Sequence, residues 1–197
     1  MKTIANKIID GGIGVIPTDT VYGLVCDALN IDSVDKIYKL KKRDYNKPLV
    51  ILISNIEMLK RCVKKINELE FDIINRYWPG ELTIVFKKSN YIPDIVAGGT
   101  DEIAMRMPNN IELIDLINSI DRPLVATSAN VSSKETITNI EMLEDSIKNN
   151  IDFIIDGGNI NNNASTIIKV IDNKIKVYRE GNISKDIINA YKDIIIK

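Results

Sequence analysis

The sequence predicts an α/β fold in which helices pack on one mixed parallel and antiparallel sheet. Short apolar runs typical of strands alternate with segments whose apolar residues repeat at helical spacing. The connections between strands differ in length, and the segment 166–178 has the pattern of a hairpin, because its Asp172-Asn173 link suits the positive φ angles of a two-residue turn. The hairpin and the irregular crossovers argue against a regular doubly wound sheet.

Periodicity and stop signals divide the first half of the chain. Gly11 ends a first helix, Ser33 and Asn55 are candidate helix caps, and Pro79 ends the helix that precedes it. The expected order is a helix before residue 11, strands 14–18 and 21–26, a helix 33–41, a strand 49–53, helices 55–66 and 71–78, and a strand 82–87.

The second half continues the alternation and contains two long polar loops, 128–138 and 157–163. The expected order is a strand 103–107, a helix 111–120, a strand 123–127, a helix 142–147, a strand 153–157, the hairpin 166–178 and a last helix 187–195.

Length and composition are those of a globular protein. The chain has 197 residues, 45% hydrophobic and 27% charged, and lacks linker-like or repetitive segments, so a single domain over residues 1–197 is expected. No apolar run reaches the length of a membrane helix, the N-terminus lacks a signal-peptide pattern, and Cys26 and Cys62 lack the spacing of a redox or metal motif. We therefore expect a cytoplasmic protein with reduced thiols, no protein-bound metal and no contact with a membrane.

Charge and the absence of histidine restrict the chemistry. The formal net charge is -1 at pH 7, so affinity for a polyanion must come from a local cluster of Lys and Arg. Because histidine is absent, Ser-His-Asp triads, Cys-His pairs and His-metal sites are excluded. Any catalysis must use Lys, Arg, carboxylates, hydroxyls or backbone amides.

The densest positive cluster comprises Lys41, Lys42, Arg43 and Lys47. Cations complement the carbonyl end of a helix, so a solvated helix terminus would explain these residues. They also have the composition of a phosphate site, in which Lys41 and Arg43 turn toward one ligand and Arg43 offers a planar fork to phosphate oxygens. No P-loop or Rossmann glycine motif accompanies them, and the residues alone leave both interpretations open.

Three further features lie at the ends of predicted strands, where open sheets gather ligand groups. The TSAN segment 127–130 offers a hydroxyl and an amide, although an ordinary turn would also explain it. Arg106 interrupts an apolar strand and requires an anion, either a structural partner such as Asp101 or Glu102 or a ligand carboxylate. Arg179 poses the same choice. Together with the basic cluster, these features describe an anion site.

The order and spacing of these motifs resemble one family, the YrdC-like threonylcarbamoyl-AMP synthases in their short single-domain form. The matching segments are PTDTVYGL at 17–24, Lys41-x-Arg43 followed by KPL at 47–49, RMP at 106–108, TSAN at 127–130, AST at 164–166 and YREG at 178–181. The resemblance covers nearly the whole chain. It implies a twisted open sheet around a concave, locally basic cavity.

The resemblance also implies the activity and the partners. L-threonine, bicarbonate or CO2, and ATP would give L-threonylcarbamoyl-AMP and pyrophosphate, the first step of the t6A37 modification of tRNA. Mg²⁺ would enter with ATP, held mainly by the phosphates. A downstream threonylcarbamoyl transferase of the TsaD type would collect the product in a transient complex, and tRNA would bind weakly.

By position, the resemblance assigns roles to individual residues. Lys41 and Arg43 would be catalytic. The threonine contacts would be Thr20, Arg106, Ala126 and Ser165, and the nucleotide contacts would be Arg43, Lys47, Ser128, Asn130, Thr136 and Arg179. The hydroxyls around Asp19, which include those of Thr18 and Tyr22, would recognise the substrate hydroxyl, because an unsatisfied polar partner rejects an isostere that lacks it.

Several positions depart from the family pattern. Leu52 stands where longer members often have His, Glu180 replaces Pro, and Glu102 replaces a small hydroxyl that touches the nucleotide. A carboxylate near phosphates repels them unless Mg²⁺ lies between, so Glu102 is not assigned to the site.

Two other functions are weighed against the synthase. A YrdC-like module could bind RNA or a nucleotide without chemistry, but the basic run has no interleaved aromatic residues and acidic residues slightly outnumber basic ones. A carbamoyl-adenylate enzyme of hydrogenase maturation belongs to much longer chains with zinc-finger and acylphosphatase parts. The synthase is therefore the expected function.

Overall fold

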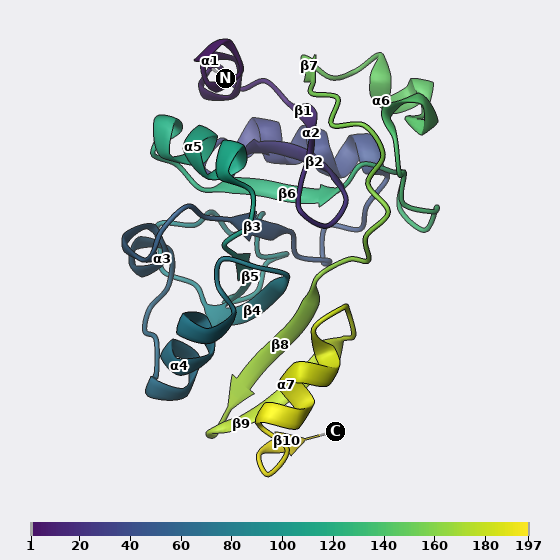
Figure 1. Cartoon of the computed structure of the whole chain (residues 1–197). Coiled ribbons are helices and arrows are strands. Elements are labelled where there is room, and N and C mark those ends of the chain that lie inside the picture. The colour runs from purple at the N-terminus through teal and green to yellow at the C-terminus, as the bar shows by residue number, and fades with distance from the viewer. Residues whose placement is uncertain (1, 197) are drawn as a thin grey trace.

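The computed structural model describes residues 2–196 and contains a ten-stranded mixed sheet (Figure 1). The strands follow the order β10-β9-β8-β4-β5-β3-β6-β2-β1-β7. Their bounds are β1 Gly14–Pro17, β2 Tyr22–Asp27, β3 Val50–Leu52, β4 Leu82–Lys87, β5 Glu102–Arg106, β6 Leu124–Ser128, β7 Phe153–Ile154, β8 Thr166–Ile171, β9 Lys174–Arg179 and β10 Ile195–Ile196. The pairs β1–β7, β3–β5, β4–β8 and β9–β10 are parallel and the others antiparallel, which confirms the predicted mixed sheet.

Helices connect the strands and cover the sheet (Figure 1). Their bounds are α1 Lys2–Ile9, α2 Ile31–Lys41, α3 Ile56–Cys62, α4 Glu68–Tyr77, α5 Ile111–Ile120, α6 Asp145–Lys148 and α7 Ser184–Ala190, with a 3-10 turn at Ile140–Met142. α1 packs on α5, and α2 packs against β2. Within residues 2–196, every helix is too short or too polar to cross a lipid bilayer.

The start of α2 differs from the prediction. Its cap is Asn30, whose side-chain oxygen accepts a hydrogen bond from the backbone N–H of Ser33, so Ser33 was wrong as the cap. The Ser33 hydroxyl instead donates to the Gly11 carbonyl at 2.8 Å. This bond ties the first turn of α2 to the end of α1.

The predicted helix 55–66 is shorter in the structure. Asn55 caps it as expected, because its side-chain oxygen accepts from the Met58 N–H at 2.8 Å. The helix ends at Cys62, since Val63 forms an antiparallel bridge with Lys88. A pairing partner 25 positions away in the chain, from 63 to 88, therefore ends a helix that local periodicity would continue.

Other element ends also shift where a cap or a long-range pairing competes with periodicity. α4 begins before the predicted 71–78 because Asn67 and Glu70 form a reciprocal capping box, with both bonds at 2.8 Å. The last helix ends at 190, earlier than the predicted 195, and the residues that follow add β10 to the sheet edge. α6 lies at 145–148, and β7 keeps only two residues of the predicted strand.

The β1–β2 turn is held by Thr18. Its hydroxyl donates to the Val21 carbonyl at 2.6 Å and accepts from the backbone N–H groups of Thr20 and Val21, both at 3.1 Å. β2 is buried along its length and pairs with β6, which places Gly23 opposite Ser128. The turn and the TSAN segment therefore lie beside each other, although they are about a hundred residues apart in the sequence.

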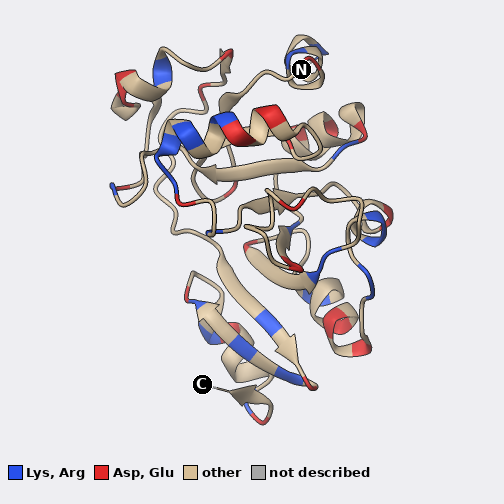
Figure 2. Cartoon of the chain, turned by 180° about the vertical axis from the view of Figure 1, so that it is seen from behind, with Lys and Arg blue, Asp and Glu red and all other residues tan. Residues whose placement is uncertain are grey.

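A long segment connects β7, at one edge of the sheet, to β8, near the opposite edge (Figure 1). From behind, the blue of Lys and Arg marks the ribbon at the end of α2 and along β8 and β9, among other places, and the red of Asp and Glu is spread over several elements that include α2 (Figure 2).

Candidate anion-binding site

The first cavity has a volume of about 410 Å³ and is lined by segments that are far apart in the sequence. They include the β1–β2 turn, the loop after α2, β3, β5, β6, the loop that follows β6, the segment before β8 and the end of β9. The structure brings together here eight of the residues that were assigned to substrates, namely Thr20, Arg43, Arg106, Ala126, Ser128, Thr136, Ser165 and Arg179. Leu52 also lines this cavity, whereas Glu102 is absent from its lining.

A second cavity of about 310 Å³ adjoins the first, because Arg43 and Ser128 line both. The other assigned residues, Lys41, Lys47 and Asn130, line this second cavity together with Lys42, Asp44, Ser132 and Ser133. Among the residues that line either cavity, Asp44 is the one carboxylate. The charged side chains that line the two neighbouring cavities are therefore mostly basic.

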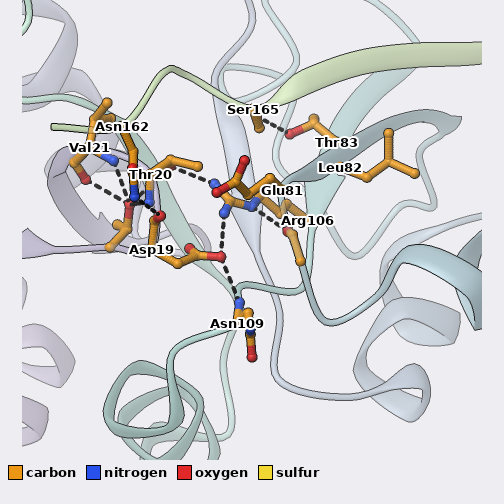
Figure 3. Close-up of polar contacts among 12 residues, drawn as sticks. Asp19, Thr20, Val21, Glu81, Leu82, Thr83, Arg106, Asn109, Asn162 and Ser165 are labelled. Atoms are coloured by element: carbon orange, nitrogen blue, oxygen red, sulfur yellow. Dashed lines mark hydrogen bonds and ion pairs between the residues drawn. The ribbon is translucent and has the colours of Figure 1, made fainter. Parts of the chain in front are cut away.

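Arg106 is buried, and its guanidinium is held from three sides (Figure 3). Nε donates to the Gly80 carbonyl at 2.8 Å, and Nη1 donates to the Thr20 hydroxyl at 2.7 Å. Nη2 lies 2.6 Å from Oδ2 of Asp19, in an ion pair whose side chains are 5% and 11% exposed. The partner in the structure is therefore Asp19.

Asp101 and Glu102 were wrong as partners of Arg106. Asp101 pairs with Lys87 at 2.8 Å, and Glu102 pairs with Lys169 at 2.6 Å. Both carboxylates precede or begin β5, whereas Arg106 lies at the other end of that strand. The sequence separation of four to five residues along an extended strand is too long for contact.

The ion pair of Asp19 and Arg106 makes contact at one oxygen only. Oδ2 also accepts from the Asn109 N–H at 2.8 Å, whereas Oδ1 is buried without a hydrogen-bond partner among the described residues. Nη2 of Arg106 is close enough to the Asp19 carboxylate to form an ion pair. The two groups are not aligned well enough for a hydrogen bond. Arg106 thus retains hydrogen-bonding capacity for a further anion.

Arg179 lies near Arg106. Its Nε donates to the Ser165 carbonyl at 2.9 Å, and its Nη2 donates to the Ser165 hydroxyl at 3.1 Å. Burial lowers the pKa of Arg179, and the positive charge of Arg106 lowers it further. Burial also lowers the pKa of Arg106, although Asp19 opposes that effect. A buried guanidinium, Arg106, and a more exposed one, Arg179, face one cavity, and two like charges in that arrangement favour the binding of an anion between them.

Arg43 is fixed by the loop that follows it. Nε donates to the Lys47 carbonyl at 3.1 Å, and Nη2 donates to the Pro48 carbonyl at 2.8 Å. Burial lowers the pKa of this guanidinium. Carbonyl dipoles hold the side chain at the junction of the two cavities without neutralising its charge.

Lys41 is 1% exposed, and its ammonium group is already coordinated by the TSAN segment. Nζ donates to the carbonyls of Ser128 and Asn130 and lies 3.3 Å from the Asn130 side-chain oxygen. Burial, and secondarily the charge of Arg43, lower the pKa of Lys41 to about 7. The solvated helix terminus is therefore wrong for Lys41, which joins the end of α2 to the TSAN segment.

The hydroxyls of Thr18, Thr20 and Tyr22 make different contacts. Thr18 and Thr20 both line the first cavity, and the Thr18 hydroxyl also stabilises the turn itself. The Tyr22 hydroxyl donates to the Gly158 carbonyl at 2.7 Å and accepts from the Gly157 N–H at 2.9 Å, so its expected role in the ligand site was wrong. β2 buries the Tyr22 ring and directs its hydroxyl to the segment after β7.

Sequence reasoning assigned no role to Asp19 or Thr83. Asp19 lies between Thr18 and Thr20 in the β1–β2 turn, and a carboxylate among hydroxyls indicates a basic partner. Thr83 is fully buried, and its hydroxyl lies 2.7 Å from the Ser165 hydroxyl (Figure 3). An alternating apolar strand gives no sign of such a contact.

No group of three or more His, Cys, Asp or Glu side chains within residues 2–196 is arranged to hold a metal ion. The two cavities offer cations, hydroxyls and amides, with Asp44 as the one carboxylate among their linings. This donor set fits a divalent ion held by ligand phosphates better than one held by a protein cage.

Comparison with known proteins identifies the family. The family model Sua5_yciO_yrdC, described as telomere recombination, matches residues 6–181. The chain belongs to the Sua5/YciO/YrdC family.

The relatives of this Sua5/YciO/YrdC chain include one of comparable length. A protein of Methanocaldococcus jannaschii is 39% identical over 182 residues, which cover 92% of this chain and 85% of that protein. The threonylcarbamoyl-AMP synthase of Bacillus subtilis is 34% identical over 88% of this chain, and the chain spans about half of that enzyme, 51%.

A solved structure of the family has the same fold. Pyrococcus abyssi Sua5 complexed with L-threonine superposes with a TM-score of 0.93 at 34% identity, covering 99% of this chain and 58% of that chain. The likeness confirms the predicted fold of an open mixed sheet with flanking helices.

Proposed function

We propose that this protein is an L-threonylcarbamoyladenylate synthase, which converts L-threonine, bicarbonate or CO2, and ATP to L-threonylcarbamoyl-AMP and pyrophosphate. The observation that supports it most directly is that Arg43, Arg106 and Arg179 line one cavity together with the hydroxyls of Thr20 and Ser165. Relatives in the same family are named for this activity. The product would supply the t6A37 modification of tRNA through a TsaD-like transferase in a transient complex, with weak tRNA binding.

The amino-acid end of the site is proposed to lie between Arg106 and Ser165. Arg106 would bind the threonine carboxylate, with the Thr20 hydroxyl beside it and Ala126 and Ser165 on the walls. Thr20, Arg106 and Ser165 are almost completely buried. The charge of Arg106 and the hydrogen bonds of all three side chains therefore act in a poorly solvated environment. An amino acid whose carboxylate is ionised and whose side chain is short and polar fits this site.

The nucleotide end is proposed to begin at Arg179, Thr136 and Ser128 and to continue into the second cavity. There Lys47 and Asn130 lie beside Arg43, and the phosphates would find the highest density of positive charge. Mg²⁺ held by these phosphates would add charge stabilisation during the transfer. Lys41 would act there both as a cation and as the group that holds the TSAN segment.

The chemistry requires no enzyme nucleophile. The threonine amine attacks CO2 to give an N-carboxylate, whose oxygen then attacks the α-phosphorus of ATP and displaces pyrophosphate. Negative charge gathers on the α-phosphate and on the leaving group, so Arg43, Arg179 and Lys41 are suited to stabilise the transition state. Positioning of the amino acid beside the triphosphate supplies the other large contribution.

The decisive experiment is mass spectrometry of the product formed by the purified protein. A mixture of L-threonine, bicarbonate and ATP with Mg²⁺ should give threonylcarbamoyl-AMP, and omission of any one substrate should abolish both that product and pyrophosphate release. A module that only binds a nucleotide would release no pyrophosphate under these conditions. That outcome, obtained with folded protein, would contradict the proposal.

Substitution of Thr20 by valine is expected to raise the KM for threonine by about tenfold or more while the KM for ATP changes by less than about twofold. Valine removes the hydroxyl that accepts from Nη1 of Arg106 at 2.7 Å and that faces the amino-acid end. Steady-state kinetics with each substrate varied in turn checks this result. Thr20→Ser retains the hydroxyl and is the control; equal changes in both KM values for Thr20→Val would count against the assignment.

ATP binding is expected to take up protons at Lys41. The pKa of Lys41 is lowered to about 7 in the protein, and a bound triphosphate raises it again, so at about pH 8 the group gains a proton on binding and ATP affinity falls as pH rises. Calorimetry in buffers of different ionisation enthalpy measures this uptake, at a pH where the γ-phosphate is already ionised. Lys41→Gln should abolish it, and identical heats in all buffers for the wild type would contradict it.

A further inference from the structure

The Ser165 hydroxyl is held by two neighbouring groups at the edge of the first cavity. Ser165 is 5% exposed, lines the cavity and directly precedes β8. Its hydroxyl lies 3.1 Å from Nη2 of Arg179. It also lies 2.7 Å from the hydroxyl of Thr83 on β4, as Figure 3 shows. The directions of these two hydrogen bonds decide where the proton of Ser165 points.

The bond from Arg179 has a fixed direction. A guanidinium has donors only, so Ser165 Oγ must accept the Arg179 bond and uses one of its two lone pairs for it. The bond between Ser165 and Thr83 has either direction, since each hydroxyl is both a donor and an acceptor.

Burial of Thr83 fixes the second direction. Thr83 is 0% exposed, and Ser165 is the one hydrogen-bond partner of its side chain among residues 2–196. If Ser165 donated, the Thr83 proton would be left buried without an acceptor, which is unfavourable. Thr83 therefore donates, both lone pairs of Ser165 are occupied, and the Ser165 proton is left free to point into the cavity.

We propose that Thr83 is a positioning residue for the amino-acid end of the site: by donating to Ser165, it makes the Ser165 hydroxyl a hydrogen-bond donor toward a substrate carboxylate. This inference rests on the proposed function, which assigns Ser165 to the amino acid. Thr83 itself does not line the cavity. The arrangement parallels Thr20, whose hydroxyl also accepts from an arginine, Arg106, and faces the same cavity.

The test compares Thr83→Val with Thr83→Ser, which differ in the hydroxyl. Calorimetric titration with L-threonine, without ATP, measures affinity independently of turnover. Thr83→Val should weaken threonine binding by about tenfold, with ATP affinity within about twofold of wild type, whereas Thr83→Ser should restore threonine binding to within about twofold of wild type. Unchanged threonine affinity in folded Thr83→Val would overturn the proposal.

Thr166 offers a matched control at the next position after Ser165. Its hydroxyl is also 0% exposed and pairs with a serine, Ser184, at 3.2 Å, but it faces α7 and does not line the cavity. Thr166→Val should leave threonine affinity unchanged. An equal loss in Thr166→Val would show a general packing effect and would overturn the role of Thr83.

A double-mutant cycle tests whether Thr83 acts through Ser165. In the Ser165→Ala background, Thr83→Val should cause no further loss of threonine affinity, because the hydroxyl that it orients is gone. A full additional loss would overturn the inference while leaving the proposed function intact. Wild-type protein that bound no L-threonine would overturn both.

Discussion

Replacement of Arg43 by alanine is expected to lower kcat/KM for threonylcarbamoyl-AMP formation by about a hundredfold to a thousandfold, the usual cost of removing one preorganised transition-state donor. Arg43 lines both cavities, so it would meet the triphosphate where the bond to phosphorus breaks. The carbonyls of Lys47 and Pro48 hold its guanidinium in place before any ligand arrives. A coupled pyrophosphate assay measures the loss.

Arg43→Lys and Arg61→Ala separate charge, geometry and folding in this experiment. Arg43→Lys keeps a positive charge but loses the planar fork, so it should recover only part of the rate. Arg61 pairs with Asp121 on the surface at 2.6 Å and lies outside both cavities, so Arg61→Ala should keep kcat/KM within about twofold of wild type. Full activity of Arg43→Ala would exclude a role for this residue in the transition state.

Asp19→Asn is expected to be the most destabilising conservative substitution in the site, lowering the free energy of unfolding by about 3 kcal/mol and Tm by roughly 6–12 °C. It removes the negative charge beside Arg106, whose side chain is 5% exposed, and leaves a buried guanidinium without its counter-ion. We take the lower end of the range for a broken buried pair, because the contact involves one carboxylate oxygen. Thermal denaturation followed by circular dichroism measures the change.

The same substitution should also affect substrate binding unequally. Without Asp19, Arg106 is held only by its bonds to Gly80 and Thr20 and is placed less firmly, so the KM for threonine should rise more than that for ATP. Asp101→Asn is the matched control, since it breaks a pair with Lys87 whose side chains are 54% and 58% exposed and should change Tm much less. Equal stability of the two variants would show that the Asp19 pair is energetically no different from a surface pair.

Local sequence patterns predicted most of the helices and strands, because the spacing of apolar residues shows which side chains of a short segment are buried. The strands that became β4 and β5 and the helix α5 appear where periodicity places them. Errors occurred where a distant group ended an element. Val63 leaves helical geometry to pair with Lys88, and the residues after 190 pair with β9 instead of continuing a helix.

Motif spacing predicted which residues meet, and the tertiary structure decided what each of them contacts. Lys41 and Arg43 were expected to turn toward one ligand, yet Lys41 binds the TSAN segment while Arg43 is held by the following loop. Arg106 required an anion, and strand register excluded the nearby Asp101 in favour of Asp19 on a different element. Such partners are set by pairings across the sheet.

By itself, the sequence determined the alternation of strands and helices, the exclusion of histidine chemistry and many of the residues that line the two cavities, because composition and short-range spacing contain that information. Only the tertiary structure decided that Asp19 neutralises Arg106, that Lys41 holds the TSAN segment and that Thr83 lies behind Ser165. The physical reason is that hydrogen-bond direction and ion pairing depend on distances of a few ångströms, here between segments that lie 82 to 89 residues apart in the sequence.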